Sequence, residues 1–208
     1  MVEVKEMSYS KKYSSVLDYM KLLEDYVLPL VKEDLGDKEV AELEKIWKGE
    51  SKPIPSDASM EEKYEIAYGN WLRNWASAFN FVSKRLGEKG IERFKQAAVE
   101  ELKRKNASPA LYMLKIMRAL APQTAFKTFA KQIAFQLQAF SPLTVSELTG
   151  RSMVVNSSHC KILDVEGCED VCLVGCQKIY PIWIKDQFRV NYETNRKGKS
   201  CTITLTPT

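Results

Sequence analysis

The chain has 208 residues, of which 45% are hydrophobic and 28% are charged, and its net charge is +4. This composition is typical of a folded protein with one domain, or with one domain and a helical extension, and it excludes a disordered chain. So small a net charge gives no indication of a nucleic-acid partner.

Two features of the chain predict a cytoplasmic protein without a membrane partner. Its first residues are polar, so we expect no secretory signal. The longest apolar region, residues 110–140, contains Pro122 and four basic residues, which excludes an ordinary transmembrane helix.

Most of the first 140 residues carry apolar side chains at intervals of three and four, which predicts amphipathic helices. We expect these helices over residues 8–34, 38–48, 59–86 and 91–105, followed by an apolar helical region over 110–140. Ser59 with Glu62 has the spacing of a capping box, and Ser108 with Pro109 is a second expected helix start.

The pattern changes after residue 142, where β-prone and alternating stretches begin. We expect strands around residues 153–155 and 160–165, a helix over 168–180, and a final hairpin with strands around 188–192 and 201–205. The predicted fold is therefore α+β, with N-terminal helices followed by a short antiparallel sheet and one cysteine-bearing helix. Residues 1–58 would form a helical extension to an α+β ligand-binding domain over 59–208, unless the whole chain is one domain.

All five cysteines lie in the last quarter of the chain, and the only histidine, His159, precedes the first of them. The five are Cys160, Cys168, Cys172, Cys176 and Cys201. Thiolates are the natural ligands of zinc and of iron–sulfur clusters, so the group predicts a metal site. The three middle cysteines share one face of an α-helix, but the outer two are about 12 Å apart along its axis. One metal could therefore take two of them, with Cys160 and Cys201 from the strands.

Three other interpretations of the cysteines stay open. Cys168, at the expected N-terminus of a helix, would have a lowered pKa and act as a catalytic nucleophile, with a neighbouring carboxylate as base. A disulfide could join Cys160 to Cys201, or Cys172 to Cys176, although one turn of helix is usually too strained for the second pair. Each cysteine could also be a small buried hydrophobic residue.

The apolar helix before the cysteines suggests where a ligand could lie. Its large apolar side chains occupy one face, with alanines between them, and that pattern allows either close packing or a pocket. The predicted pocket residues are Phe126, Phe129, Ile133 and Leu137.

The order of these elements resembles a known superfamily. The residues that carry the resemblance are His159 and Cys160, the run from Cys168 to Cys176, and the run from Lys197 to Leu205. Over residues 60–208 the chain resembles the superfamily of the bacteriochlorophyll 4-vinyl-reductase domain and the L-2-amino-thiazoline-4-carboxylate hydrolases. The resemblance implies an α+β fold, often dimeric, that holds a small molecule between helices and sheet.

In that superfamily the cysteines would be metal ligands or active-site thiols. By position, Cys168, Cys172 or Cys176, and Cys201 would inherit the role. The triple spacing departs from the pattern expected of a hydrolase and favours a metal.

The sequence therefore predicts a small-molecule-binding domain with a cysteine-rich zinc or iron–sulfur site. The expected ligand is small and apolar or of mixed polarity, and a homodimer is expected. The alternative is a cysteine-dependent hydrolase of a small cyclic amide or thiazoline. A third interpretation makes the helices a dimer interface and the cysteines merely buried.

Overall fold

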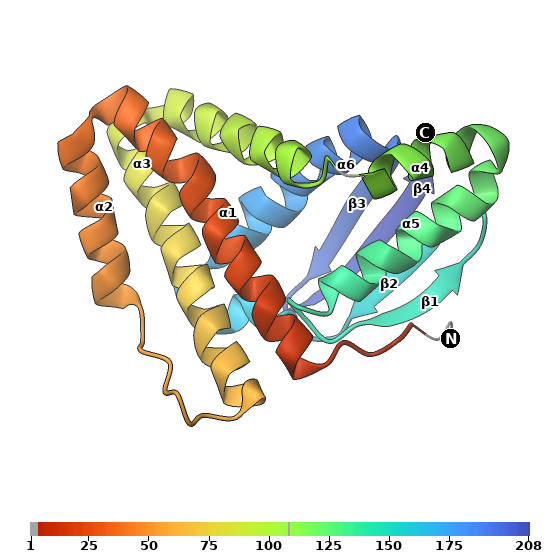
Figure 1. Ribbon diagram of the computed structural model, residues 1–208, viewed down its shortest axis with the longest axis horizontal. Coiled ribbons are helices and arrows are strands. Elements are labelled where there is room, and N and C mark those ends of the chain that lie inside the picture. The colour runs from red at the N-terminus through yellow and green to blue at the C-terminus, as the bar shows by residue number, and fades with distance from the viewer. Residues whose placement is uncertain (1–3, 108) are drawn as a thin grey trace.

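The computed structural model describes residues 4–107 and 109–208. Within these residues the chain forms helices followed by a four-stranded antiparallel sheet, which confirms the predicted α+β class (Figure 1). The helices are α1 (Tyr9–Leu35), α2 (Asp37–Glu50), α3 (Met60–Lys105), α4 (Pro109–Leu120), α5 (Pro122–Leu137) and α6 (Tyr180–Phe188). The strands are β1 (Thr144–Leu148), β2 (Met153–Ser157), β3 (Val190–Lys197) and β4 (Ser200–Pro207).

Helices α1, α2 and α3 pack together on the side of the molecule away from β1 (Figure 1). The predicted capping box begins α3, because the Ser59 hydroxyl accepts from the backbone of Glu62 while the Glu62 carboxylate accepts from the backbone of Ser59. Gly87, at a φ of 60° and ψ of −145°, bends α3 where the sequence predicts a break between two helices. That backbone conformation strongly favours glycine.

The N-terminal helices share one core with the rest of the chain. Val16 and Val27 of α1 belong to the same buried apolar cluster as Trp75 of α3 and Leu205 of β4. The domain boundary at residues 58 and 59 stays a prediction. The expected cap at Ser108 lies outside the described residues.

The sheet has the strand order β1-β2-β4-β3, so β4 lies between β2 and β3. One face is apolar and packs under α5, the helical segment η2 (Val171–Ile179) and α6 (Figure 1). The other face carries polar side chains such as Thr202, Thr204 and Thr206, as the alternation predicts. The predicted hairpin is confirmed, with Gly198 at a φ of 60° in its turn. The sequence did not predict β1.

Two predicted elements around the cysteines are wrong in kind. The expected strand over residues 160–165 is instead a 3-10 helix, η1 (Lys161–Asp164), which Cys160 precedes. The expected α-helix over 168–180 is a π-helix, η2 (Val171–Ile179), that continues into α6. π-Helices are rare and often occur at functional sites, where an extra residue changes which side chains face inward.

Helix α4 exposes several large apolar side chains, among them Tyr112, Met113 and Leu120, the last with an exposed fraction of 81%. The predicted homodimer stays a prediction. No helix of the described ranges has both the length and the apolar character needed to cross a membrane.

Candidate functional site

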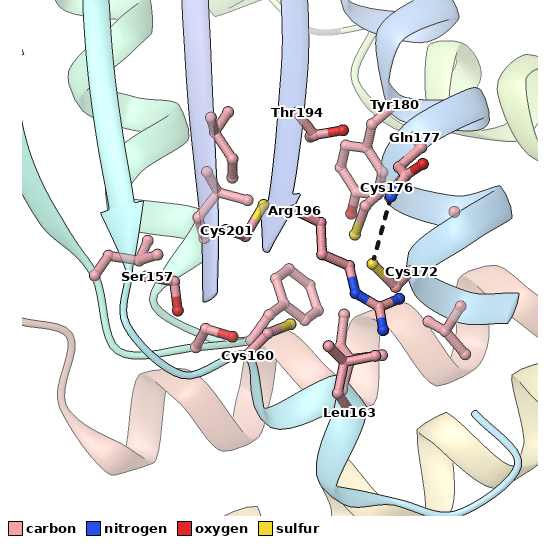
Figure 2. Close-up of a pocket in the computed structure, with 18 of the residues that line it drawn as sticks. Ser157, Cys160, Leu163, Cys172, Cys176, Gln177, Tyr180, Thr194, Arg196 and Cys201 are labelled. Atoms are coloured by element: carbon pink, nitrogen blue, oxygen red, sulfur yellow. Dashed lines mark hydrogen bonds between the residues drawn. The ribbon is translucent and has the colours of Figure 1, made fainter. Parts of the chain in front are cut away.

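Four of the five cysteines line one cavity between the sheet, the π-helix η2 and helix α3. Figure 2 shows Cys160, Cys172, Cys176 and Cys201 around this space. The cavity has a volume of about 80 Å³. Its apolar wall includes Trp71 and Trp75 of α3, Leu137 of α5, and Ile162 and Leu163 of η1. The cysteines that cluster in the sequence therefore also lie around one cavity in the structure, with the exception of Cys168.

The sheet side of the cavity is built by a row of three residues on neighbouring strands. Ser157 on β2 pairs with Cys201 on β4, and Cys201 pairs in turn with Arg196 on β3. Residues paired across strands point to the same face of a sheet. Cys201 lies on the apolar face of the sheet, together with Ile203 and Leu205.

The helical side of the cavity is supplied by η2, which contributes Cys172, Gly175, Cys176 and Gln177. The Gln177 side-chain amide donates to the Cys172 sulfur at 3.9 Å, a contact between residues five apart (Figure 2). A Cβ added to Gly175 would meet only Trp75 Cζ2, at 3.8 Å. The absence of a side chain at Gly175 therefore keeps space open between η2 and α3.

Three thiols of this cavity, those of Cys172, Cys176 and Cys201, have raised pKa values and are protonated at neutral pH. Burial raises the pKa of Cys176 well above its ordinary value, and the neighbouring cysteines raise it further. Burial likewise raises the pKa of Cys201 to about 11. Burial also raises the pKa of Cys172, although Arg196 and Gln177 oppose that rise. As neutral groups, these thiols form a soft and weakly polar wall.

Cys168 lies outside the cavity and is 1% exposed. The prediction that its pKa is lowered is wrong, because burial raises it to about 11. Cys168 does stand at the start of a helical segment, as predicted, but loss of hydration outweighs the field of the helix end there. The proposed catalytic role for Cys168 gains no support from this environment.

His159 does not face the cysteines. Its Nε2 contacts Asp164 Oδ2 at 2.5 Å, and the two side chains are 48% and 40% exposed. Lys199 and His159 lower the pKa of the Asp164 carboxyl. In this position His159 is poorly placed to act as a base for a cysteine of the cavity.

The cysteines have suitable chemistry for a soft metal, but their positions do not form a metal site. Within residues 4–107 and 109–208, no three His, Cys, Asp or Glu side chains are gathered as ligands of one ion. A tetrahedral zinc needs its thiolates at about 2.3 Å from a single point. The side chains as placed therefore do not fit zinc or an iron–sulfur cluster, and metal binding stays a prediction for elemental analysis of protein purified without air.

The predicted pocket residues of α5 are all buried but do not line one pocket. Leu137 lines the cysteine cavity, and Ile133 lies in the core. Phe126 and Phe129 border a different cavity of about 310 Å³, near the C-terminal strand. The division follows from helix geometry, since positions 126 and 137 are about three turns apart.

Among the cavity residues that the sequence did not indicate are Ser157 and Arg196. The alternation of side chains along a strand could have indicated both residues. Ser157 lies two positions after Val155 and four after Met153, and Arg196 lies two positions after Thr194 and four after Tyr192, so each shares a face with those residues. The Ser157 hydroxyl is buried and has no hydrogen-bond partner among the described residues. Such groups are rare in native proteins and call for an explanation.

The raised pKa of Cys168 predicts a loss of stability at alkaline pH. Its value of about 11, against an ordinary 9.0, means that the unfolded chain loses this proton first. The stabilising effect is full below pH 9 and is lost between about pH 9 and 11. We expect roughly 1–2 kcal/mol of the unfolding free energy to be lost through this thiol at pH 10.5.

Urea unfolding under reducing conditions at pH 8 and pH 10.5 measures this loss in the wild type and in Cys168→Ala. The loss should be smaller in the variant, because alanine does not titrate, while other alkaline groups act equally in both proteins. Equal losses would contradict the assignment of a buried, protonated thiol to position 168.

Comparison with known proteins assigns no family to this chain. No family model matches it, and no curated protein matches it. Among solved structures it is similar to a mutant of an Fe(II) unliganded H-NOX protein from K. algicida. The identity is 10% and the TM-score 0.36, over 90% of this chain and 95% of that one. A similarity of this size assigns neither a fold family nor a function.

Proposed function

We propose that the protein is a small-molecule-binding domain, related to the superfamily that its C-terminal cysteines resemble, and that the cysteine-lined cavity is its binding site. One observation carries the proposal. Ser157 is among the residues that line this cavity, and its buried hydroxyl has no hydrogen-bond partner in the described residues. Leaving such a group unpaired costs about 1–3 kcal/mol, and a ligand with one polar atom would remove that cost.

The walls of the cavity indicate the size and polarity of the ligand. Its volume of about 80 Å³ suits a compound of a few non-hydrogen atoms. Two indole rings, Trp71 and Trp75, and neutral thiols offer it apolar and polarisable contacts. A ligand here would have a small apolar body with few polar groups.

A cysteine-dependent hydrolase is the second candidate, and the surroundings of Cys172 favour it. Arg196 and Gln177 both act on Cys172 and oppose the rise in its pKa. If the cavity performs thiol chemistry, Cys172 rather than Cys168 is the nucleophile. Iodoacetamide labelling at neutral pH separates the candidates, since a single fast-reacting Cys172 indicates the enzyme and slow labelling of every cysteine indicates the binding domain.

The binding function is tested with two small neutral probes, cyclopropanecarboxamide and isopropanol. Trp71 and Trp75 line the cavity, so the tryptophan fluorescence of the protein reports their entry. We expect saturable changes with dissociation constants on the order of 1 mM, as suits ligands of so few atoms. The variant Gly175→Leu, which places a side chain into the cavity, should abolish them.

Gly49→Leu is the matched control, because Gly49 lies on the exposed side of α2 and a Cβ there meets nothing within 4 Å. It should bind both probes as the wild type does. Wild-type protein that shows no saturable change up to about 20 mM probe would overturn the proposed function. So would unchanged binding by a folded Gly175→Leu protein, because the probes would then bind elsewhere.

A further inference from the structure

Helix α4 turns an apolar face to the solvent. Tyr112, Met113, Ile116 and Leu120 are all exposed, with exposed fractions of 67% and 56% for the first two. At about 100° per residue, the four side chains fall within an arc of about 100° on one side of the helix. Figure 1 shows α4 at the opposite end of the molecule from α2. A surface helix usually turns its polar side outward, so this face indicates a contact beyond the chain itself.

Positive charge gathers beside the apolar face of α4. The cavity of about 310 Å³ between α4, α5 and the start of β3 has four basic residues in its wall, Lys115, Arg118, Arg151 and Arg189, and all four are exposed. Its wall contains no aspartate or glutamate from the described part of the chain. A carboxylate at Thr208, the last residue of the sequence, would still leave four positive charges against one negative.

These positive charges have no carboxylate partner within the chain. Arg118 donates to the Phe188 carbonyl at 3.2 Å, and none of the four basic residues forms an ion pair within residues 4–107 and 109–208. Asp186, which is close to Arg189 in sequence, is paired with Lys103 at 2.9 Å. Residues 102–146 contain no aspartate or glutamate, although the whole chain has 27. The surface around α4 therefore lacks the acidic residues that neutralise basic ones elsewhere.

An apolar face beside unpaired positive charge fits an anionic membrane better than a second copy of this chain. In a symmetric dimer across α4, the same basic residues of two copies would face each other without a carboxylate between them. A lipid membrane instead offers anionic headgroups to the basic residues and an apolar layer to the side chains that project from α4. Because lipid chains are fluid, they need no groove shaped to those side chains.

We propose that α4 and the basic residues beside it bind the surface of anionic lipid membranes. The helix lies along the membrane, its four exposed apolar side chains enter the boundary between headgroups and acyl chains, and the basic residues contact the headgroups. The expectation of no membrane partner rested on the lack of a spanning helix, and a helix that lies along the surface needs neither the length nor the continuous apolar character of a spanning one. This cavity and the cysteine cavity share no lining residue, so binding at each can be tested separately.

Vesicles of phosphatidylcholine with about 30% phosphatidylserine, and vesicles of phosphatidylcholine alone, are a matched pair of probes. Co-sedimentation of the full chain should show about 100-fold or more tighter binding to the anionic vesicles, since each basic residue near the surface contributes about 5-fold. Added salt should weaken this binding. Lys115→Gln with Arg151→Gln should weaken it about 25-fold. Met113→Gln with Leu120→Gln should weaken it at least about 10-fold, because less apolar surface enters the membrane.

Two variants control for charge and for apolar surface. Lys38→Gln with Lys48→Gln removes two positive charges from exposed positions of α2, at the other end of the molecule (Figure 1). Leu17→Gln removes an exposed apolar side chain of α1. Both should bind the anionic vesicles as the wild type does, and circular dichroism establishes that each variant is folded.

Equal sedimentation of the wild type with the two kinds of vesicle, or sedimentation with neither, would overturn the membrane inference. So would unchanged binding by either folded double variant of the α4 surface. Light scattering tests the other occupant of this face. A wild-type dimer that becomes a monomer in Met113→Gln with Leu120→Gln would assign the face to a second copy and would also overturn the inference. None of these results alters the test of the cysteine cavity with neutral probes.

Discussion

Trp75→Ala is expected to lower the free energy of unfolding by about 3–5 kcal/mol, the range for loss of a large buried aromatic side chain. Trp75 is 6% exposed and stacks on Phe79 with ring centroids 5.5 Å apart. It also meets the Phe94 ring edge to face at 5.2 Å. The same indole lines the cysteine cavity, so its removal would join a new void to an existing space. The surrounding side chains therefore cannot easily move in to fill the void.

Urea unfolding measures the effect, and Leu120→Ala is the control. Leu120 is 81% exposed on α4, so its loss should change stability by no more than about 0.5 kcal/mol. Indole should restore part of the stability of Trp75→Ala, because a ligand that binds only the folded state stabilises it. A loss below about 1 kcal/mol in Trp75→Ala would contradict the packing of α3 against the cavity.

Ser157→Ala is expected to have the opposite sign and to raise the free energy of unfolding by about 1–3 kcal/mol. The serine hydroxyl is buried without a partner, so folding removes its hydrogen bonds to water and no hydrogen bond within the described residues replaces them. Alanine has no such group and fits the same space. The variant should at the same time bind small polar probes more weakly, since the hydroxyl is the group offered to them. Stability and binding would then be in conflict at one residue.

Ser141→Ala is the matched control for this substitution. Ser141 is also buried and also lines the cavity, but its hydroxyl accepts from the backbone N–H of Lys161 at 3.3 Å. Its removal leaves a donor without that partner and should cost about 1 kcal/mol. Chemical denaturation of both variants measures whether each substitution raises or lowers the free energy of unfolding. A destabilised Ser157→Ala would show that the hydroxyl has a partner, and would remove the main support for a ligand site.

Much of the fold follows from periodicity in the sequence. The helical stripes of α1 and α3, the capping box at Ser59 and the final hairpin all appear where apolar spacing and turn residues indicate them. The direction of Cys201 follows from the same alternation. These features depend on local rules, which a single sequence exposes.

The elements that the sequence predicted wrongly depend on the number of residues per helical turn and on tertiary contacts. Residues 160–165 have β-prone side chains, but they form the short helix η1 beside the hairpin, where Cys160 donates its backbone N–H to Lys199. Spacing cannot separate a π-helix from an α-helix, because both place residues four apart near one face. Burial of Cys168, and hence its raised pKa, depends on side chains far away in the sequence.

The site itself was half predicted. The cysteines were identified by their clustering, whereas Ser157 and Arg196 gave no signal by type, because serine and arginine are common at surfaces. Alternation along β2 and β3 would have placed both on the face of Cys201 if strand order had been known. Since β2 and β3 are separated by more than 30 residues, that order is a property of the assembled sheet.

The π-winding of η2 also bears on how this chain should be aligned with other sequences. Each residue of an α-helix turns the chain by about 100°, so an α-helical version of this segment would differ from η2 by one residue in length. Deleting one residue between Val171 and Ile179 would thus restore the commoner winding without disturbing α6 or the hairpin. We therefore expect a relative with an α-helical version of this segment to show a one-residue gap between its counterparts of Cys172 and Cys176. A search that demands the four-residue cysteine spacing of this chain would pass them over.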